Sequence, residues 1–585
     1  MLAILLSWTV ILFIFVTLGD LFISSYNKTC SRNETYNLFD QFFISIAPFS
    51  ILVSVLSIWL PSNHYLLFGF ILLSLVYWAV NLPKLRRFCS NVKQKICRLS
   101  ILEWGIIVLV FSSFVIMSLW LVPNFDSMYY HYQNIHWNEK YSAVYGLANL
   151  EDRFGFNSNY LLISAVFSFR FLLGEAIYPF QLLFVLMLMG WILSELVKRK
   201  FDAKSTTIFI LYFLYILISM NNIMNTSTDV VPNVIIFYLI ARLILYPDSL
   251  KDSALLYFCL PVVLLTFKIS VAPLCLLSLY ILVSILRRKE YKSLLFLLIV
   301  AVLCVLPWLV RNVIISGYLI YPLPEIDLFS FDWEVPTSVA LAQKEYIREY
   351  AQWEFVGTMI LDRFASNPIA TSKMYLLNRY TIMLIYLVVC LSPLSIIYNL
   401  IKRRKIHPTY IFIYTALSLY IVYWYLVAPD FRFVGGVMFG LVGLTICLFF
   451  SENKSEKNIL KKIVVLGLTV LSFLVFGKQM YYYAGYVDLR NDKPQLYSLL
   501  IMPYNSQLLV EKMQGWEIEY EPLDIGNGVI IYTTDHESAC TFDKLPATSS
   551  IVGGLHKKFQ DISSIEARGT SLQEGFRAKE GYIVK

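Results

Sequence analysis

The sequence predicts an all-α polytopic membrane protein. Of its 585 residues, 58% are hydrophobic and 15% are charged, whereas soluble domains carry about 25% charged residues. Mean hydropathy is +0.63. Apolar windows of roughly 20 residues recur along the chain, and each is long enough to cross about 30 Å of hydrocarbon as a helix. A helix also satisfies its own backbone hydrogen bonds in lipid.

Fourteen candidate spans follow one another along the chain. Residues 1–25 lack the basic start and the small-residue cleavage site of a secretory signal, so we expect them to form the first span. The spans cover residues 1–24, 38–60, 64–82, 101–122, 177–197, 205–221, 230–246, 254–268, 271–286, 293–315, 376–400, 408–428, 431–450 and 460–480.

Basic residues cluster in five segments between the spans. Because Lys and Arg accumulate in cytoplasmic loops, we expect these segments in the cytoplasm and both termini outside. The net charge of +8 then reflects membrane orientation, not nucleic-acid binding. The five segments are 84–98, 198–200, 287–292, 402–405 and 454–462.

Two apolar segments need separate treatment. Residues 160–174 are short and contain Arg170, so we expect a helix that lies at the outer interface or dips into it. Residues 254–286 are too long for one span. Because successive loops lie on alternating sides of the membrane, we expect two spans here, with Lys268 near the outer turn between them.

The chain divides into two predicted domains. Residues 1–484 form the transmembrane domain, including outer loops 123–176 and 317–375. Residues 485–585 are richer in Gly and charge, contain the strand-like run GVIIYTT (528–534), and are expected to form a small extracytoplasmic α+β domain. Its one cysteine, Cys540, allows no internal disulfide. The nine cysteines show no CxxC or Cys/His metal spacing.

The most polar stretch near the membrane runs from residue 125 to 159, where polar groups are costly unless they line a wet cavity or carry function. Asp126 is the first acidic residue of this stretch. It either binds a divalent cation or accepts a proton from a hydroxyl, or it serves only as a helix N-cap. In a helix starting near Ser127, Tyr130, Asn134 and Trp137 share one face. The tyrosines and Trp137 form either a sugar-stacking wall or an interfacial aromatic belt.

Asp229, in TSTDVV, is a second acid at the entrance of a span. Alone it is typical of a helix cap; with Asp126 it would complete an oxygen-rich site for Mg or Mn. His131 and His136 are five residues apart, a spacing that favours hydrogen bonding over a metal pair.

Several cations are expected near the outer membrane surface. They either bind the phosphate of a lipid carrier or extend their charged ends to the headgroups. The motifs HExxH, GxSxG and the Walker loop are absent, which disfavours zinc proteolysis, serine hydrolysis and ATP-driven transport. These cations are Arg153, Arg170, Lys268, Arg311 and Arg432.

The order of these motifs resembles the GT-C superfamily of membrane glycosyltransferases. Asp126 in NFDSMYYH matches the acid of the first large outer loop, and Asp229 is similar to the acid before a later span. The segments PWLVRNVIISGYLIYP (307–322) and APDFRF (428–433) are similar to the W…RN…YP and D-x-R stretches. Two departures are that this loop follows the fourth span and that Ser127 replaces a second acid.

A closer likeness is to an uncharacterised bacterial group of multi-span proteins. It is carried by GLANL…RFGFNS (146–158) and by a terminal RG…GF, in which the residues are Arg568, Gly569, Gly575 and Phe576. Together the two likenesses cover most of the chain.

The resemblance implies an inverting glycosyltransferase in the cytoplasmic membrane, facing the periplasm. It would move a sugar from a polyprenyl-phosphate donor to a glycan, lipid or protein acceptor, and no nucleic acid would take part. Asp126 would be the catalytic residue. Asp126 and Asp229 would be the ligands of any divalent cation. The alternatives are a ligase or polymerase using diphosphate-linked glycans, a transporter or flippase, and an envelope scaffold. Lys268, Arg311 and Arg432 would bind the donor phosphate, and the expected substrate-binding residues are Tyr130, His131, Trp137, Asn149, Arg153, Asn157 and Asp229.

Overall fold

The computed structural model of the chain describes residues 1–119, 124–359, 373–449, 463–471, 473–475, 477–478, 500–503, 519–534, 544–550 and 559–579. The predicted basic segment 454–462, Cys540, part of loop 317–375 and most of 485–518 lie outside these residues.

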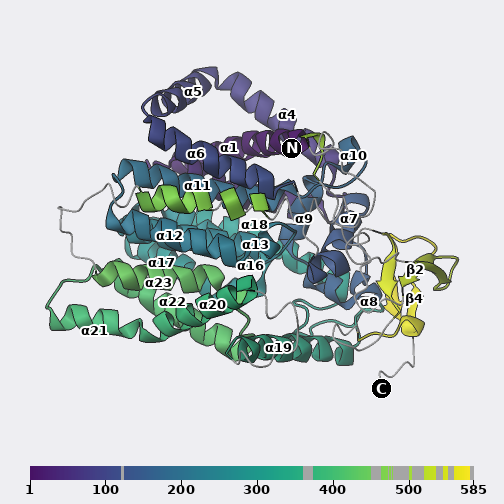
Figure 1. Ribbon diagram of the computed structural model, residues 1–585. Coiled ribbons are helices and arrows are strands. Elements are labelled where there is room, and N and C mark those ends of the chain that lie inside the picture. Colours follow the sequence, from purple (N-terminus) through teal and green to yellow (C-terminus); the bar gives the residue numbers. More distant parts are fainter. Residues whose placement is uncertain are drawn as a thin grey trace.

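The described residues are mostly helical, and the long helices pack side by side in one bundle (Figure 1). The first six helices are α1 (Leu2–Cys30), α2 (Leu38–Ile44), α3 (Ile46–Leu56), α4 (His64–Val80), α5 (Leu82–Ile96) and α6 (Ile101–Met117). The loop that follows contains η1 (Ser127–His131), α7 (Tyr132–Lys140), α8 (Leu147–Leu150), η2 (Asp152–Phe156), α9 (Asn159–Val166) and α10 (Arg170–Leu173).

The rest of the bundle is formed by helices between residues 179 and 449. They are α11 (Pro179–Lys198), α12 (Ala203–Ile218), α13 (Met220–Ile223), α14 (Val230–Leu245), α15 (Ser249–Asp252), α16 (Ala254–Phe267), η3 (Ile269–Leu274), α17 (Cys275–Arg287), α18 (Tyr291–Ser316), η4 (Pro324–Ile326), α19 (Thr337–Met359), α20 (Lys373–Leu391), α21 (Pro393–Ile401), α22 (Pro408–Val427), η6 (Phe431–Phe433) and α23 (Gly435–Phe449).

Several of these helices are suited to a membrane. Among the described residues, six helical segments are long and apolar enough to cross it, or eight if α4–α5, bent by 94°, and α20–α21, bent by 41°, each count as one span. Within the described residues, each of the fourteen predicted spans overlaps an apolar helix, and the span 460–480 is described only in part. Fourteen crossings are nevertheless not confirmed, because the shorter helices, at 1.5 Å per residue, fall short of about 30 Å.

The two irregular segments fold as separate short helices. All eight residues of α9 are buried, and a helix of this length is too short to cross a bilayer. Residues 254–287 form α16 and α17, which pack against each other with Lys268 at the break between α16 and η3.

Helix α14 lies at the centre of the bundle, with all sixteen residues buried. Its closest partner is α23, whose glycines allow the backbones to approach. A Cβ on Gly436 would lie 2.2 Å from the carbonyl oxygen of Asn233, and one on Gly440 would lie 2.5 Å from Ile240. Small residues four apart are typical of helix packing in membranes, where packing cannot rely on the hydrophobic effect.

The C-terminal residues form two small sheets. One has the order β1 (Glu521–Asp524), β2 (Ile530–Thr534) and β3 (Ala547–Ser549), with β1 antiparallel and β3 parallel to β2. The other pairs β4 (Ile565–Ala567) with β5 (Phe576–Ala578) in antiparallel register. The strand predicted within 528–534 is confirmed as β2; a domain boundary at residue 485 stays a prediction.

The bundle has two chemically different ends (Figure 1). The strands lie beside α7 and α8 at one end, whereas α5 and α21, which carry or precede predicted basic segments, lie at the opposite end. This arrangement agrees with the predicted separation of basic segments from the polar loop. The identity of the membrane and the sidedness stay predictions.

Candidate functional site

A cavity of about 740 Å³ lies where the 124–159 loop meets the ends of several helices. Its wall is supplied by η1, η2, α12, α14, η3, α19, α20, α22 and η6, so residues far apart in sequence meet there. It contains four acidic and four basic side chains, which are Asp126, Asp229, Glu354 and Asp430, and Arg153, Lys268, Arg379 and Arg432.

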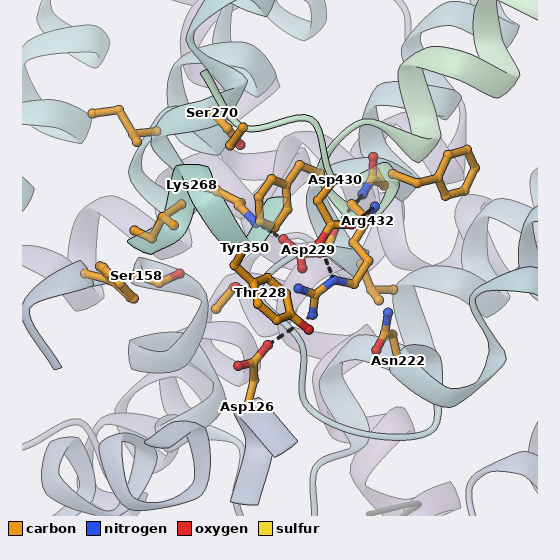
Figure 2. A pocket seen from close by; sticks show the side chains of 18 of the residues that line it. Asp126, Ser158, Asn222, Thr228, Asp229, Lys268, Ser270, Tyr350, Asp430 and Arg432 are labelled. Carbon is orange, nitrogen blue, oxygen red and sulfur yellow. Dashed lines mark hydrogen bonds and ion pairs between the residues drawn. The ribbon is translucent and has the colours of Figure 1, made fainter. Parts of the chain in front are cut away.

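Asp126 and Arg432 point toward each other across this cavity (Figure 2). Arg432 Nη1 donates to Asp126 Oδ2 at 3.1 Å, and Arg432 Nε donates to Asp430 Oδ2 at 2.8 Å. The side chain of Asp126 is 32% exposed and that of Arg432 31%, whereas Asp430 is 5% exposed. The Asp126–Arg432 pair is therefore reachable from the cavity, and Asp430 supports it from behind.

The packing of α14 against α23 fixes the position of Arg432. Asn233 on α14 donates to the carbonyl of Arg432 at 2.7 Å and accepts from the backbone N–H of Gly436 at 2.7 Å. Asp430 also accepts from the backbone N–H of Arg432 at 2.8 Å. The guanidinium is thus held by a short turn that is bound on both sides to buried groups.

Arg153 approaches Asp126 from the other side. Its Nη1 lies 3.6 Å from Asp126 Oδ1, and its side chain is 8% exposed. The pKa of Asp126 results from two opposing effects: burial disfavours the carboxylate, but Arg432 and Arg153 outweigh burial and lower the pKa to about 2. Asp126 is consequently ionised throughout the neutral range.

Asp229 forms a second ion pair in the cavity, with the ammonium of Lys268, which also lies 3.4 Å from the centre of the Phe433 ring. Asp126 and Asp229 occupy the N-cap positions of η1 and α14, but neither side chain accepts a capping hydrogen bond. The helix-cap interpretation is therefore wrong for both carboxylates, because cations near each of them compete more strongly than a backbone N–H.

The helix that follows Asp126 begins with a π turn. The N–H of Tyr132 donates to the carbonyl of Ser127, five residues earlier, and this wider turn alters the register of the helix. Tyr130, His131 and Asn134 line the cavity. His131 Nδ1 lies 2.8 Å from the carbonyl oxygen of Thr226, and burial lowers the pKa of His131, which favours its neutral form.

Trp137, a predicted substrate-binding residue, does not line the cavity. Its Nε1 donates to Gln133 Oε1 at 3.0 Å, and its ring packs 6.0 Å from Phe576. Tyr130 and Asn134 line the cavity, whereas Trp137 lies almost one turn further along α7, beyond the cavity wall.

Two further predicted site residues also lie outside the cavity. Asn149 is fully buried and donates to the carbonyl of Trp333 at 2.8 Å. Arg311 is 2% exposed, and its nitrogens donate to Ser57, Asn138 and Asn157.

The remaining predicted residues have mixed placements. Asn157 lines the cavity and also bonds Asn312 at 2.8 Å. Arg170 pairs with Glu139 at 2.7 Å, away from the cavity. The structure therefore brings together Asp126, Tyr130, His131, Arg153, Asn157, Asp229, Lys268 and Arg432.

Sequence reasoning missed the contribution of α19. Tyr346, Tyr350, Glu354 and Thr358 line the cavity at four-residue spacing along this helix. Arg379 on α20 joins them through Glu354, at 3.4 Å. The four-residue repeat within a predicted loop is the signal that indicates a helix with one polar and aromatic face.

The divalent-cation site predicted at Asp126 and Asp229 stays a prediction. In the described part of the chain, no group of three or more His, Cys, Asp or Glu side chains lies close enough to hold an ion. Asp126 and Asp229 are each paired with a cationic side chain instead.

The fold and the site define a class, namely a polytopic helical protein with a polar cavity at one end of its bundle. The chain belongs to the family described as Domain of unknown function (DUF8201), whose profile matches residues 1–439. No curated protein and no solved structure matches the chain. The matched region contains every cavity residue named above, and it ends before the strands.

Proposed function

We propose that the protein is an inverting glycosyltransferase that moves a sugar from a polyprenyl-phosphate donor to a glycan, lipid or protein acceptor. The carrying observation is the contact of Asp126 with Arg432 and Arg153 inside a cavity of about 740 Å³. Ile382 and Tyr386 of α20 and Val427 of α22 form its apolar side. The order of motifs that resembles the GT-C superfamily supports the same assignment.

The reaction requires one displacement at the anomeric carbon. The acceptor hydroxyl gives its proton to a carboxylate oxygen of Asp126 while its oxygen bonds to the anomeric carbon. The bond from that carbon to the phosphate oxygen breaks, and the electron pair stays on the phosphate. Arg432 and Lys268 offer the positive charge that stabilises this leaving group. A single in-line step inverts the configuration.

The shared contacts of Arg432 explain how so acidic a carboxylate can act as a base. Asp126 with a pKa of about 2 is a weak base while both arginines contact it. A donor phosphate that draws Arg432 away removes the nearer cation, which raises the basicity of Asp126. Donor binding would thereby prepare the base for the acceptor.

The balance of charges bears on the alternative that uses diphosphate-linked glycans. Such a donor carries more negative charge and favours a cavity with an excess of cations. The cavity contains equal numbers of acidic and basic side chains, so the charge count supports the monophosphate donor.

The proposal is tested with the full chain in nanodiscs and a panel of polyprenyl-phosphate sugars plus a membrane glycan extract. Release of polyprenyl phosphate is followed by mass spectrometry. Wild type should release it, and Asp126→Asn should lose the activity by about 100-fold or more. Asp252→Asn is the matched control, because Asp252 is exposed and lies outside the cavity. Equal release by wild type and Asp126→Asn would remove Asp126 from the chemistry, and no release from folded wild type would favour transport or scaffolding.

A further inference from the structure

The C-terminal residues pack directly on the loop that carries Asp126. Phe576 N–H donates to the carbonyl of Tyr145 at 3.0 Å. A Cβ on Gly575 would lie 1.8 Å from that carbonyl oxygen, and a Cβ on Gly146 would lie 2.1 Å from the carbonyl oxygen of Phe576. The two glycine-containing motifs that resemble those of an uncharacterised bacterial group are therefore in mutual contact, although more than 400 residues lie between Gly146 and Gly575.

Four aromatic rings surround the guanidinium of Arg153. Its Cζ lies 4.9 Å from the centre of the Tyr129 ring, 5.6 Å from Phe125, 5.7 Å from Tyr130 and 5.8 Å from Tyr346. Cations at this distance are attracted to ring faces. The rings therefore determine where the guanidinium lies relative to Asp126.

Two C-terminal side chains support two of these rings. Thr548 Oγ1 and the hydroxyl of Tyr129 both donate to Glu151 Oε2, each at 3.2 Å. Glu151 is 3% exposed and Thr548 1%, so these bonds are buried. The ring of Phe559 packs edge-on against Tyr346, with 5.9 Å between centres. Phe559 N–H also donates to Asp152 Oδ2 at 2.6 Å, next to Arg153 in sequence.

We propose that Thr548 and Phe559 support the site from the C-terminal part of the chain. Thr548 holds the ring of Tyr129 through Glu151, and Phe559 holds the ring of Tyr346. These rings position Arg153 against Asp126. Thr548, Phe559 and Glu151 are positioning residues, because none of them lines the cavity. The expected effect on the transfer rate rests on the proposed function, whereas the expected effect on the position of Arg153 does not. It gives a role to residues beyond position 439, where the family match ends.

Loss of this support should change the titration of Asp126 as well as the rate. A displaced Arg153 stabilises the carboxylate less, so the acid limb of the pH–rate profile moves to higher pH. The acid limb of kcat/KM reports the free enzyme, in which Arg432 still contacts Asp126 and limits the shift to about 0.5–1 pH unit. The charged and titratable groups around Asp126 are Arg153, Arg432, Tyr130, His131, Asp229, Tyr346 and Tyr350.

The test uses Thr548→Val and Phe559→Leu in the full chain, with Thr533→Val as the matched control. Thr533 pairs with Thr548 across the same sheet, but its hydroxyl bonds the carbonyl of Glu521. Hydrogen–deuterium exchange of residues 125–156 should become several-fold faster in both test variants and stay unchanged in the control. Transfer should fall about 10-fold, with the acid limb shifted upward.

The two readouts separate the two proposals. Unchanged exchange and an unchanged acid limb in Thr548→Val and Phe559→Leu would overturn the positioning role. If wild type transfers no sugar while exchange increases in the test variants, the positioning role stands and the proposed function fails. An equal effect of Thr533→Val would show general loosening of the sheet and would also overturn the inference.

Discussion

Arg432 shows how one side chain can serve two carboxylates. Its Nε contacts Asp430 and its Nη1 contacts Asp126, which requires the planar fork of an arginine. The folded-state pKa of Asp126, about 2, lies below the ~3.9 of an unfolded chain. The ion pairs of Asp126 therefore stabilise the fold fully above about pH 4, and this contribution is lost as the pH falls toward 2.

Replacement of Arg432 should affect both the rate and its pH dependence. Arg432→Gln removes the nearer cation from Asp126, so we expect a loss of about 10²–10³-fold in transfer and an acid limb at higher pH. Arg432→Lys keeps the charge but not the double contact, and should retain more activity. Rates between pH 3 and 8 are compared with Arg288→Gln, which removes an arginine outside the cavity. An unshifted acid limb in Arg432→Gln would contradict the assigned ion pair.

At the scale of elements, the contact between α14 and α23 links membrane packing to the site. Gly436 lies against the backbone of Asn233, and the side chain of Asn233 holds the turn that contains Arg432. A change in the distance between these two helices is therefore transmitted to the cavity.

Gly436→Ala should destabilise the protein by about 1–3 kcal/mol, because its Cβ would overlap a backbone oxygen that cannot move freely. The measurement is the thermal unfolding midpoint in detergent, together with transfer activity. Gly69→Ala is the control, since a Cβ at Gly69 meets nothing within 4 Å. Similar losses from both substitutions would mean that the effect is not specific to the α14–α23 contact.

At the scale of the whole molecule, the strands lie at one end of the bundle, and α5 and α21 lie at the other (Figure 1). The cavity is lined by the polar loop that carries Asp126. This separation places a polar, ion-paired cavity beside apolar helices. A donor with a lipid tail and a polar head has both kinds of contact available there.

Thiol labelling tests the predicted sidedness. One variant keeps Cys89, exposed on α5, as its only cysteine, and another carries Leu523→Cys on exposed β1 in a cysteine-free background. In sealed right-side-out vesicles, an impermeant maleimide should label Leu523→Cys directly and Cys89 only after lysis. Labelling of both without lysis would contradict the predicted topology.

Much of the site was accessible to sequence reasoning because polar residues near a membrane are rare. That rarity indicates Asp126, Asp229, Lys268 and Arg432 as candidate site residues, and all four line the cavity. The same argument indicates Arg311 as a ligand of the donor phosphate. Arg311 instead lies outside the cavity and donates to neutral oxygens of Ser57, Asn138 and Asn157. Composition identifies a costly charge without identifying which group neutralises it.

The sequence by itself determined the helical membrane class, the positions of the apolar helices and the polar loop, since these follow from local hydropathy and residue type. Tertiary structure alone decided that Arg432 and Arg153 share Asp126, that α19 supplies Tyr346 and Tyr350, and that the C-terminal strands support the loop. Except for the contact of Arg153 with Asp126, these contacts join residues that are far apart in the sequence, and they depend on helix register and backbone approach. Hydropathy also does not record where the cavity ends: Asn134 lines it, whereas Trp137, almost one turn further along α7, packs against Phe576.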